Sequence, residues 1–113
     1  MIETGYGVEW ARAGVSSATT GTSLFSPLVN YRRDCAGFMV NVDTLTGGYV
    51  KIGGGVSGSD PVWFYTEKTG VFQMPLEFPG LRGTKDLGAS VAVSGTCLVD
   101  VRLGTYLVKV TSE

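Results

Sequence analysis

Apolar and polar residues alternate with a period of two in several parts of this chain, and this pattern limits the possible folds most. It is clearest over residues 38–43, 72–78 and 97–103. Successive side chains of a β-strand point to opposite faces, so this period is typical of strands with one face in a core. The 3.6-residue period of a helix does not occur in the sequence. We therefore predict an all-β protein.

Glycine-rich turn signals divide the apolar segments at intervals of about ten residues. The chain holds 17 glycines, and Thr46-Gly47-Gly48 is typical of a tight turn between two strands. The segments between such signals predict roughly eight to nine short strands, as in β-sandwiches and small barrels. The connections at residues 53–61 and 79–88 are long, which favours a jelly roll over an up-and-down barrel. We therefore expect an antiparallel β-sandwich of jelly-roll type.

Residue composition argues against several functional classes. Nine Lys and Arg against ten Asp and Glu give a net charge of −1, whereas nucleic-acid binders carry a basic excess. The chain has no histidine, which removes the commonest general base, Ser-His and Cys-His pairs and most zinc sites. We therefore expect no enzyme activity, no cofactor and no bound metal. A pair of carboxylates brought together by the fold stays open as the catalytic alternative, with Glu9, Glu67 and Glu77 as candidates.

The sequence shows no sign of a membrane span or a signal peptide. Its apolar stretches fall short of the roughly 18–20 residues of a span, so we expect no membrane partner. The first five residues, MIETG, lack the basic and apolar regions of a signal peptide. Without a secretory signal, Cys35 and Cys97 are expected to be reduced and buried. The apolar content of 43% predicts either a well-filled core or apolar surface buried against partners.

The N-terminal part of the chain is predicted to differ from the rest. Val8 and Trp10 fall on one face of a short strand. Residues 14–23 are mostly Ser, Thr and Gly without periodicity, which indicates a loop or a flexible arm. The chain therefore divides into residues 1–23, an N-terminal strand and flexible Ser/Thr/Gly arm, and residues 24–113, the β-sandwich domain.

A glycine-rich segment at residues 53–58, GGGVSG, matches the G-x-G-x-x-G pattern of dinucleotide-binding proteins. Such a site needs a helix that begins at the loop, because the pyrophosphate binds to the helix N-terminus. Here Ser59-Asp60-Pro61 follows and leads into another apolar strand. The segment is therefore predicted to connect two strands.

Two pairs of residues are candidates for an interface with a partner: Trp63 and Tyr65, and Arg32 and Arg33. In the segment VWFYT, Phe64 is expected in the core, which turns Trp63 and Tyr65 to the other face. Their rings would then meet the second sheet, a partner or, in another function, a stacked sugar. The arginine pair is too short for a polybasic patch and is predicted to lie in a solvated polar connection. A salt bridge to a partner is the alternative.

Residues 46–110 resemble a known family. The likeness is carried by FPGL at 78–81, GASVAV at 88–93, Ser94-Gly95 and the aromatic Tyr106 of the last strand. With the aromatic strand and the long loop that precede them, these segments resemble the small jelly-roll proteins that decorate or cement the capsids of tailed bacteriophages. The resemblance covers a little over half of the chain.

The resemblance implies a virion structural protein that binds the capsid exterior as a homotrimer and stabilises the shell. Its partners would be further copies of itself and the major capsid protein, and it would be made in the cytoplasm of the bacterial host. The family has no catalytic residues. In cement proteins an N-terminal extension often reaches a neighbouring subunit, which would suit residues 14–23. The alternatives are another virion subunit, at the head–tail joint or in a tail tip or fibre, and a carbohydrate-binding β-sandwich with Trp63 and Tyr65 as stacking platforms.

Overall fold

The computed structural model describes residues 3–4, 7–55, 60–75 and 80–110, and its regular elements are β-strands. These residues form nine strands and no helix, so none of them forms a helix that could cross a membrane, and the prediction of an all-β chain is confirmed. The strands are β1 (Glu3–Thr4), β2 (Glu9–Val15), β3 (Thr19–Phe25), β4 (Tyr31–Thr46), β5 (Val50–Gly53), β6 (Val62–Thr66), β7 (Gly70–Pro75), β8 (Ala89–Val93) and β9 (Thr96–Lys109).

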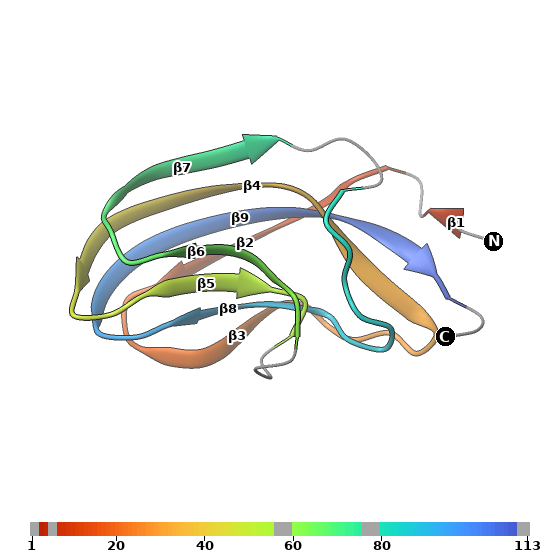
Figure 1. Ribbon diagram of the computed structural model, residues 1–113, viewed down its shortest axis with the longest axis horizontal. Coiled ribbons are helices and arrows are strands. Elements are labelled where there is room, and N and C mark those ends of the chain that lie inside the picture. Colours follow the sequence, from red (N-terminus) through yellow and green to blue (C-terminus); the bar gives the residue numbers. More distant parts are fainter. Residues whose placement is uncertain (1–2, 5–6, 56–59, 76–79, 111–113) are drawn as a thin grey trace.

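The strands form two antiparallel sheets packed into a β-sandwich, as predicted (Figure 1). The five-stranded sheet has the order β2-β9-β4-β7, and β1 pairs with the C-terminal end of β9, on the same edge as β2. The four-stranded sheet has the order β3-β8-β5-β6. Six pairs of consecutive strands therefore cross between the sheets: β2 to β3, β3 to β4, β4 to β5, β6 to β7, β7 to β8 and β8 to β9.

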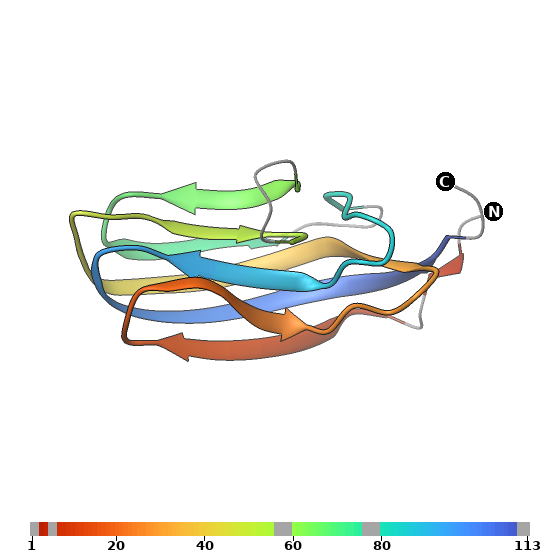
Figure 2. The same cartoon turned by 90° about the horizontal axis from the view of Figure 1, so that it is seen from below.

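The two ends of the sandwich differ in their connections. Short turns at residues 16–18, 47–49, 67–69 and 94–95 join the crossing strands at one end, on the left of Figure 1. Figure 2, at right angles, again shows these turns on the left and β1 on the right. The longer connections, from β3 to β4 and from β7 to β8, run at the right-hand end.

The core lies between the sheets and follows the alternation seen in the sequence. On β4, Val40 and Val42 are buried while Asn41 is exposed, and on β9, Val101 and Leu103 are buried. The four-stranded sheet contributes four fully buried residues from β5 and β8: Val50, Ile52, Val91 and Val93. Each buried side chain of this size contributes about 1.5–3 kcal/mol to folding. This shared apolar layer holds the two sheets together.

The prediction of a loop or flexible arm at residues 14–23 is wrong. β2 continues to Val15, β3 begins at Thr19, and residues 16–18 turn between them. β2 pairs with β9 and β3 pairs with β8, one in each sheet. These neighbours supply backbone hydrogen bonds to a segment whose side chains carry little apolar signal, and threonine suits a strand. Both strands are therefore built into the sandwich.

The alternating segment at residues 72–78 is described only in part. β7 is the edge strand of its sheet and finishes at Pro75, a residue that sheets tolerate at their edges. Phe72 packs against the core, and Met74 is 44% exposed. Residues 76–79, where the alternation and part of the family-like motif were expected, lie outside the described residues.

Candidate functional site

Trp63 lies in the core, which is one of the positions expected for its ring, but it does not share the exposed face of Tyr65 as the alternation predicted. The residue is 7% exposed, and its Nε1 donates a hydrogen bond to the carbonyl oxygen of Arg82, 3.2 Å away. The cause is a β-bulge, in which Ile52 and Gly53 of β5 oppose three residues of β6. A slip of one residue turns a side chain to the other face of its strand. Trp63 is therefore not available as an exposed stacking platform in this fold.

The other two aromatic residues of β6 lie on the faces that were predicted for them. Phe64 packs against the core, with its ring centroid 5.0 Å from that of Phe38. Tyr65 is 51% exposed, and its ring stacks on that of Tyr49 at 5.5 Å. The Tyr65 hydroxyl donates a hydrogen bond to Oε1 of Glu67 at 2.9 Å, and this bond raises the pKa of Tyr65 above its ordinary value. Of the two predicted interface rings, Tyr65 alone is presented to solvent.

Arg32 and Arg33 lie inside a strand, and the prediction of a solvated connection is wrong. β4 begins at Tyr31, and the two arginines are 7% and 8% exposed. Nε and Nη2 of Arg32 donate hydrogen bonds to the two carboxylate oxygens of Asp34, at 2.9 and 3.2 Å. Asp34 also accepts one from the backbone N–H of Gly83 at 2.9 Å. These partners compensate for the cost of removing the charges from water.

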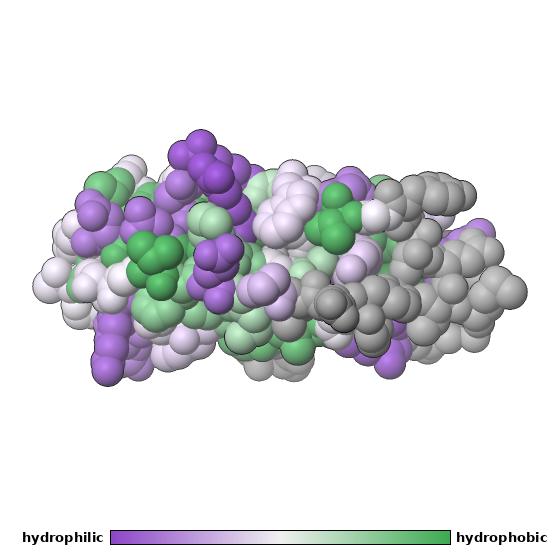
Figure 3. Space-filling view, turned by 90° about the horizontal axis from the view of Figure 1, so that it is seen from above, coloured by the Kyte–Doolittle hydropathy of each residue, from purple (hydrophilic) through white to green (hydrophobic). Residues whose placement is uncertain are grey.

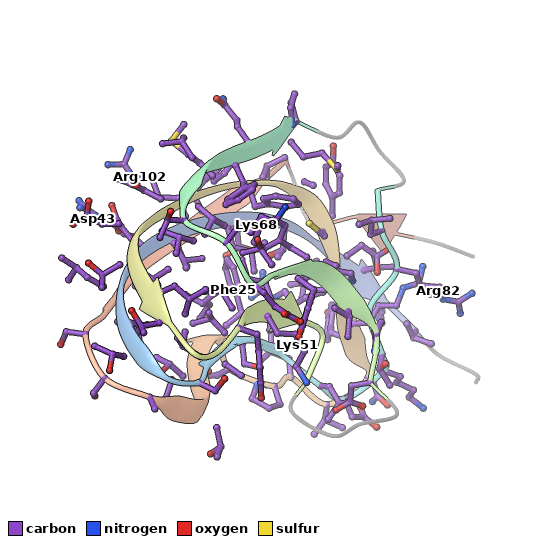
Figure 4. All side chains as sticks on the ribbon, turned by 60° about the vertical axis from the view of Figure 1, so that its left-hand side comes forward. Phe25, Asp43, Lys51, Lys68, Arg82 and Arg102 are labelled. Carbon is purple, nitrogen blue, oxygen red and sulfur yellow. The ribbon has the colours of Figure 1, made fainter. Side chains whose placement is uncertain are left out.

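Arg33 is held by three residues from other strands. Its Nη1 donates to Oε1 of Glu9 at 2.9 Å and to Oγ1 of Thr105 at 3.5 Å. The guanidinium carbon lies 4.6 Å from the ring centroid of Phe25, which is a cation–π contact. Phe25 itself lies between the two sheets in Figure 4. Nε of Arg33 is buried and finds no acceptor among the described residues. Both arginines proposed for a partner interface therefore have partners within the chain.

Residues 80–83 connect the aromatic strand to this charged cluster. They accept the hydrogen bond of Trp63, donate one to Asp34 and exchange two backbone hydrogen bonds with Cys35, at 2.7 and 3.0 Å. At Gly83 a Cβ atom would lie 1.9 Å from a backbone carbonyl oxygen of β4, so a larger residue would push the segment away. Trp63 and the β4 cluster thus anchor one connection, and Tyr65 takes no part in it.

A surface that sequence reasoning missed lies on the outer face of the five-stranded sheet. Trp10, Gly104, Gly37 and Pro75 lie in register across β2, β9, β4 and β7. Trp10 is 62% exposed, yet its ring covers Gly104, because a Cβ atom there would lie 2.9 Å from two ring atoms and 2.8 Å from Val8. Val8 and Trp10 therefore share a face, as predicted, and it is the outer one. The signal in the sequence was Trp10 itself, but its glycine neighbour lies 94 positions away (104 minus 10).

A hollow of about 400 Å³ lies beside Trp10 on this face. Its lining includes Trp10, Arg12, Met39, Gln73, Pro75 and Arg102. Arg12 is held by Asp100 through two hydrogen bonds, at 3.0 and 3.1 Å. Arg102 projects away from the sandwich (Figure 4), and it has no ion-pair partner in the part of the chain that the structure describes. The hollow therefore combines an apolar wall with an available positive charge.

Apolar residues do not form one continuous patch on the face seen from above. Figure 3 shows separate green areas there, among purple hydrophilic residues. Val62 and Val71, on β6 and β7, are 52% and 70% exposed. Single exposed apolar side chains are normal on a protein surface. Val62 and Val71 are notable only because they lie on the edge strands of the two sheets.

The two cysteines, the most reactive side chains of the sequence, are buried. Cys35 and Cys97 are free and buried, as expected, and burial raises the pKa of Cys35 to about 11. The Cys35 thiol is therefore protonated at neutral pH.

Across the described ranges, no three or more His, Cys, Asp or Glu side chains lie close enough together to hold a metal ion. The glycine-rich segment follows β5 and leads to β6, as predicted, and its residues 56–59 lie outside the description.

Comparison with known proteins gives no match, either to a family model or to a curated protein.

Proposed function

We propose that this protein is a virion structural protein that binds the exterior of a tailed-bacteriophage capsid as a homotrimer and stabilises the shell, and that its sandwich is a jelly roll. The observation that supports this most directly is the strand order, β2-β9-β4-β7 in one sheet and β3-β8-β5-β6 in the other. Apart from the two-residue β1, each sheet has four strands. Two four-stranded sheets with chain connections that cross between them are the arrangement of a jelly roll. The family that residues 46–110 resemble is built on this fold.

The exposed side chains give the second line of support, because a fold alone does not determine a function. Trp10 and Tyr65 are 62% and 51% exposed, and Met39 and Met74 are 37% and 44% exposed. Tryptophan, tyrosine and methionine are enriched in protein–protein interfaces. In a symmetric shell, weak contacts of each copy add up through avidity. These residues suit a protein that acts by binding other protein surfaces.

The β6–β7 side of the sandwich suits contacts between copies. β6 and β7 are the last strands of their sheets, and Val62, Tyr65 and Val71 are exposed on them. An edge strand has unpaired backbone groups that readily bind another chain. We assign the trimer contact to this side, with Tyr65 as its aromatic anchor.

The proposal is tested by the oligomeric state and by binding to shells. Light scattering at micromolar concentration should give about three times the chain mass, and Val71→Lys should lower it by placing a charge on the edge. Capsids of the encoding phage, assembled without this protein, should bind it in sedimentation and become more resistant to heat. A monomer that binds no such capsid would contradict the proposal. Binding to a glycan array would then favour the carbohydrate-binding alternative.

A further inference from the structure

We infer that the hollow beside Trp10 is a docking site for a protein surface that presents an acidic side chain next to an apolar one. The inference rests on the proposed function, in which that surface belongs to the capsid. It places shell binding on the outer face of the five-stranded sheet, whereas contacts between copies use the β6–β7 side.

The shape and lining of the hollow suit an inserted apolar side chain. Its volume of about 400 Å³ is within the range of ligand pockets, roughly 300–1,000 Å³. Trp10, Met39 and Pro75 form much of the wall, and Met74 also lines it. Tryptophan and arginine are the residues most often found as binding hot spots, and methionine adapts its shape to a partner. The Trp10 ring is already held against Gly104, so its side chain would lose little conformational entropy on binding.

The charge of the hollow selects an acidic partner over a second copy of this chain. Arg12 is neutralised by Asp100, which leaves the guanidinium of Arg102 as the available charge. A symmetric contact of this hollow with itself would bring Arg102 of one copy close to Arg102 of the other. Like charges at an interface disfavour such pairing. An aspartate or glutamate on a different protein satisfies the guanidinium instead.

The polar groups of the lining favour a carboxylate over a sugar. Arg12 and Arg102 can only donate hydrogen bonds, and Gln73 supplies the only side-chain acceptor among the polar residues that line the hollow in the described structure. Sugar hydroxyls both donate and accept, so a sugar would leave donors without acceptors here. A carboxylate accepts from both sides and matches arginine geometry.

Three variants of the full chain test the inference on the capsids described above. Trp10→Ala and Arg102→Glu should each weaken capsid binding about tenfold or more, while light scattering still reports the wild-type mass. Salt should weaken binding of the wild-type protein, and Arg102→Gln should reduce this salt dependence. Leu98→Ala is the matched control, since Leu98 is 49% exposed on β9 and does not line the hollow. It should bind like the wild type.

The outcomes separate the two proposals. Wild-type binding that survives both substitutions overturns the inference and leaves the proposed function in place. Absence of wild-type binding overturns the proposed function and this assignment of the partner with it. Binding of the wild type to a glycan, lost in Trp10→Ala, would show a sugar as the occupant. Arg102 is exposed, so Arg102→Glu keeps the test decisive if Trp10→Ala does not fold, as judged by circular dichroism.

Discussion

The two halves of β4 are buried in different ways. From Phe38 to Val42, alternate residues enter the core and those between them face outward. From Arg32 to Ala36, every residue is buried, and three of the five are charged. Residues two apart share a face of a strand, so Arg32 and Asp34 lie on one face and Arg33 on the other. This half is therefore covered on both sides.

The difference shows what holds each half in place. Apolar burial stabilises the alternating half directly, in proportion to the area removed from water. Buried charges contribute little net stability, but the removal of one partner leaves the other in an unfavourable place. We therefore expect the charged half to be sensitive to single substitutions that remove a partner, and the apolar half to be sensitive to lost volume.

The largest effect is expected from Asp34→Ala in the charged half. The substitution removes the bidentate partner of Arg32 and the acceptor of the Gly83 N–H. Breaking a buried ion pair from one side typically costs about 3–5 kcal/mol. Urea unfolding should show that the free energy of unfolding falls by this amount. Asp34→Asn keeps an acceptor for Gly83 and should lose less. A loss under about 1 kcal/mol in Asp34→Ala would mean that the cluster is hydrated.

A somewhat smaller effect is expected from Leu103→Ala in the apolar half. Leu103 is fully buried and pairs with Phe38 across the sheet. Truncation of a core leucine costs about 2–5 kcal/mol, depending on how far the cavity collapses. The loss, measured by the same unfolding, should be independent of salt. Leu98→Ala on the exposed face of β9 is the control and should change stability little. Equal losses in both variants would contradict the assigned faces.

This contrast also explains which parts of the fold could be predicted. The core of β4 and β9 could be predicted, because alternation is a local signal. Trp63 was expected to share a face with Tyr65 and does not, because a bulge shifts the alternation by one residue and leaves no mark in the sequence. Arg33 was placed in solvent, because its partners Glu9 and Thr105 lie 24 and 72 positions away. The spacing of Arg32 and Asp34, two residues apart on one strand face, was the available sign of an internal pair.

The serine- and threonine-rich strand and the Trp10 hollow were missed for a related reason. β3 is specified by pairing with β8, which lies some 70 residues later in the chain, and its own residues carry little periodicity. The hollow exists because β2, β9, β4 and β7 bring their residues into register, and strand order cannot be derived from single segments. Long-range pairing, rather than local pattern, therefore determines the candidate site.

A more gradual effect is expected from pH at Cys35, where the charged half of β4 ends. Burial raises the pKa of Cys35 from 9.0 to about 11, so the folded protein keeps the thiol protonated where the unfolded chain loses the proton. The unfolded state then binds fewer protons, and stability falls as pH rises from 9 to 11. The free energy of unfolding, measured across this pH window, should fall less steeply with pH in Cys35→Ala than in the wild type. Identical slopes would indicate that the Cys35 thiol reaches water.

The smallest effect on stability is expected from Asp100→Asn, on the outer face of the alternating half. The pair of Arg12 and Asp100 has good geometry, but its side chains are 65% and 34% exposed. Solvent and salt screen such a pair, so thermal unfolding should change little at low salt and still less at high salt. The substitution nevertheless releases the Arg12 guanidinium beside the hollow, which adds a second available cation next to Arg102. Asp100→Asn should therefore bind an acidic partner more tightly than the wild type at low salt. A large loss of stability in this variant would contradict the prediction and show that the Arg12–Asp100 pair holds the fold together.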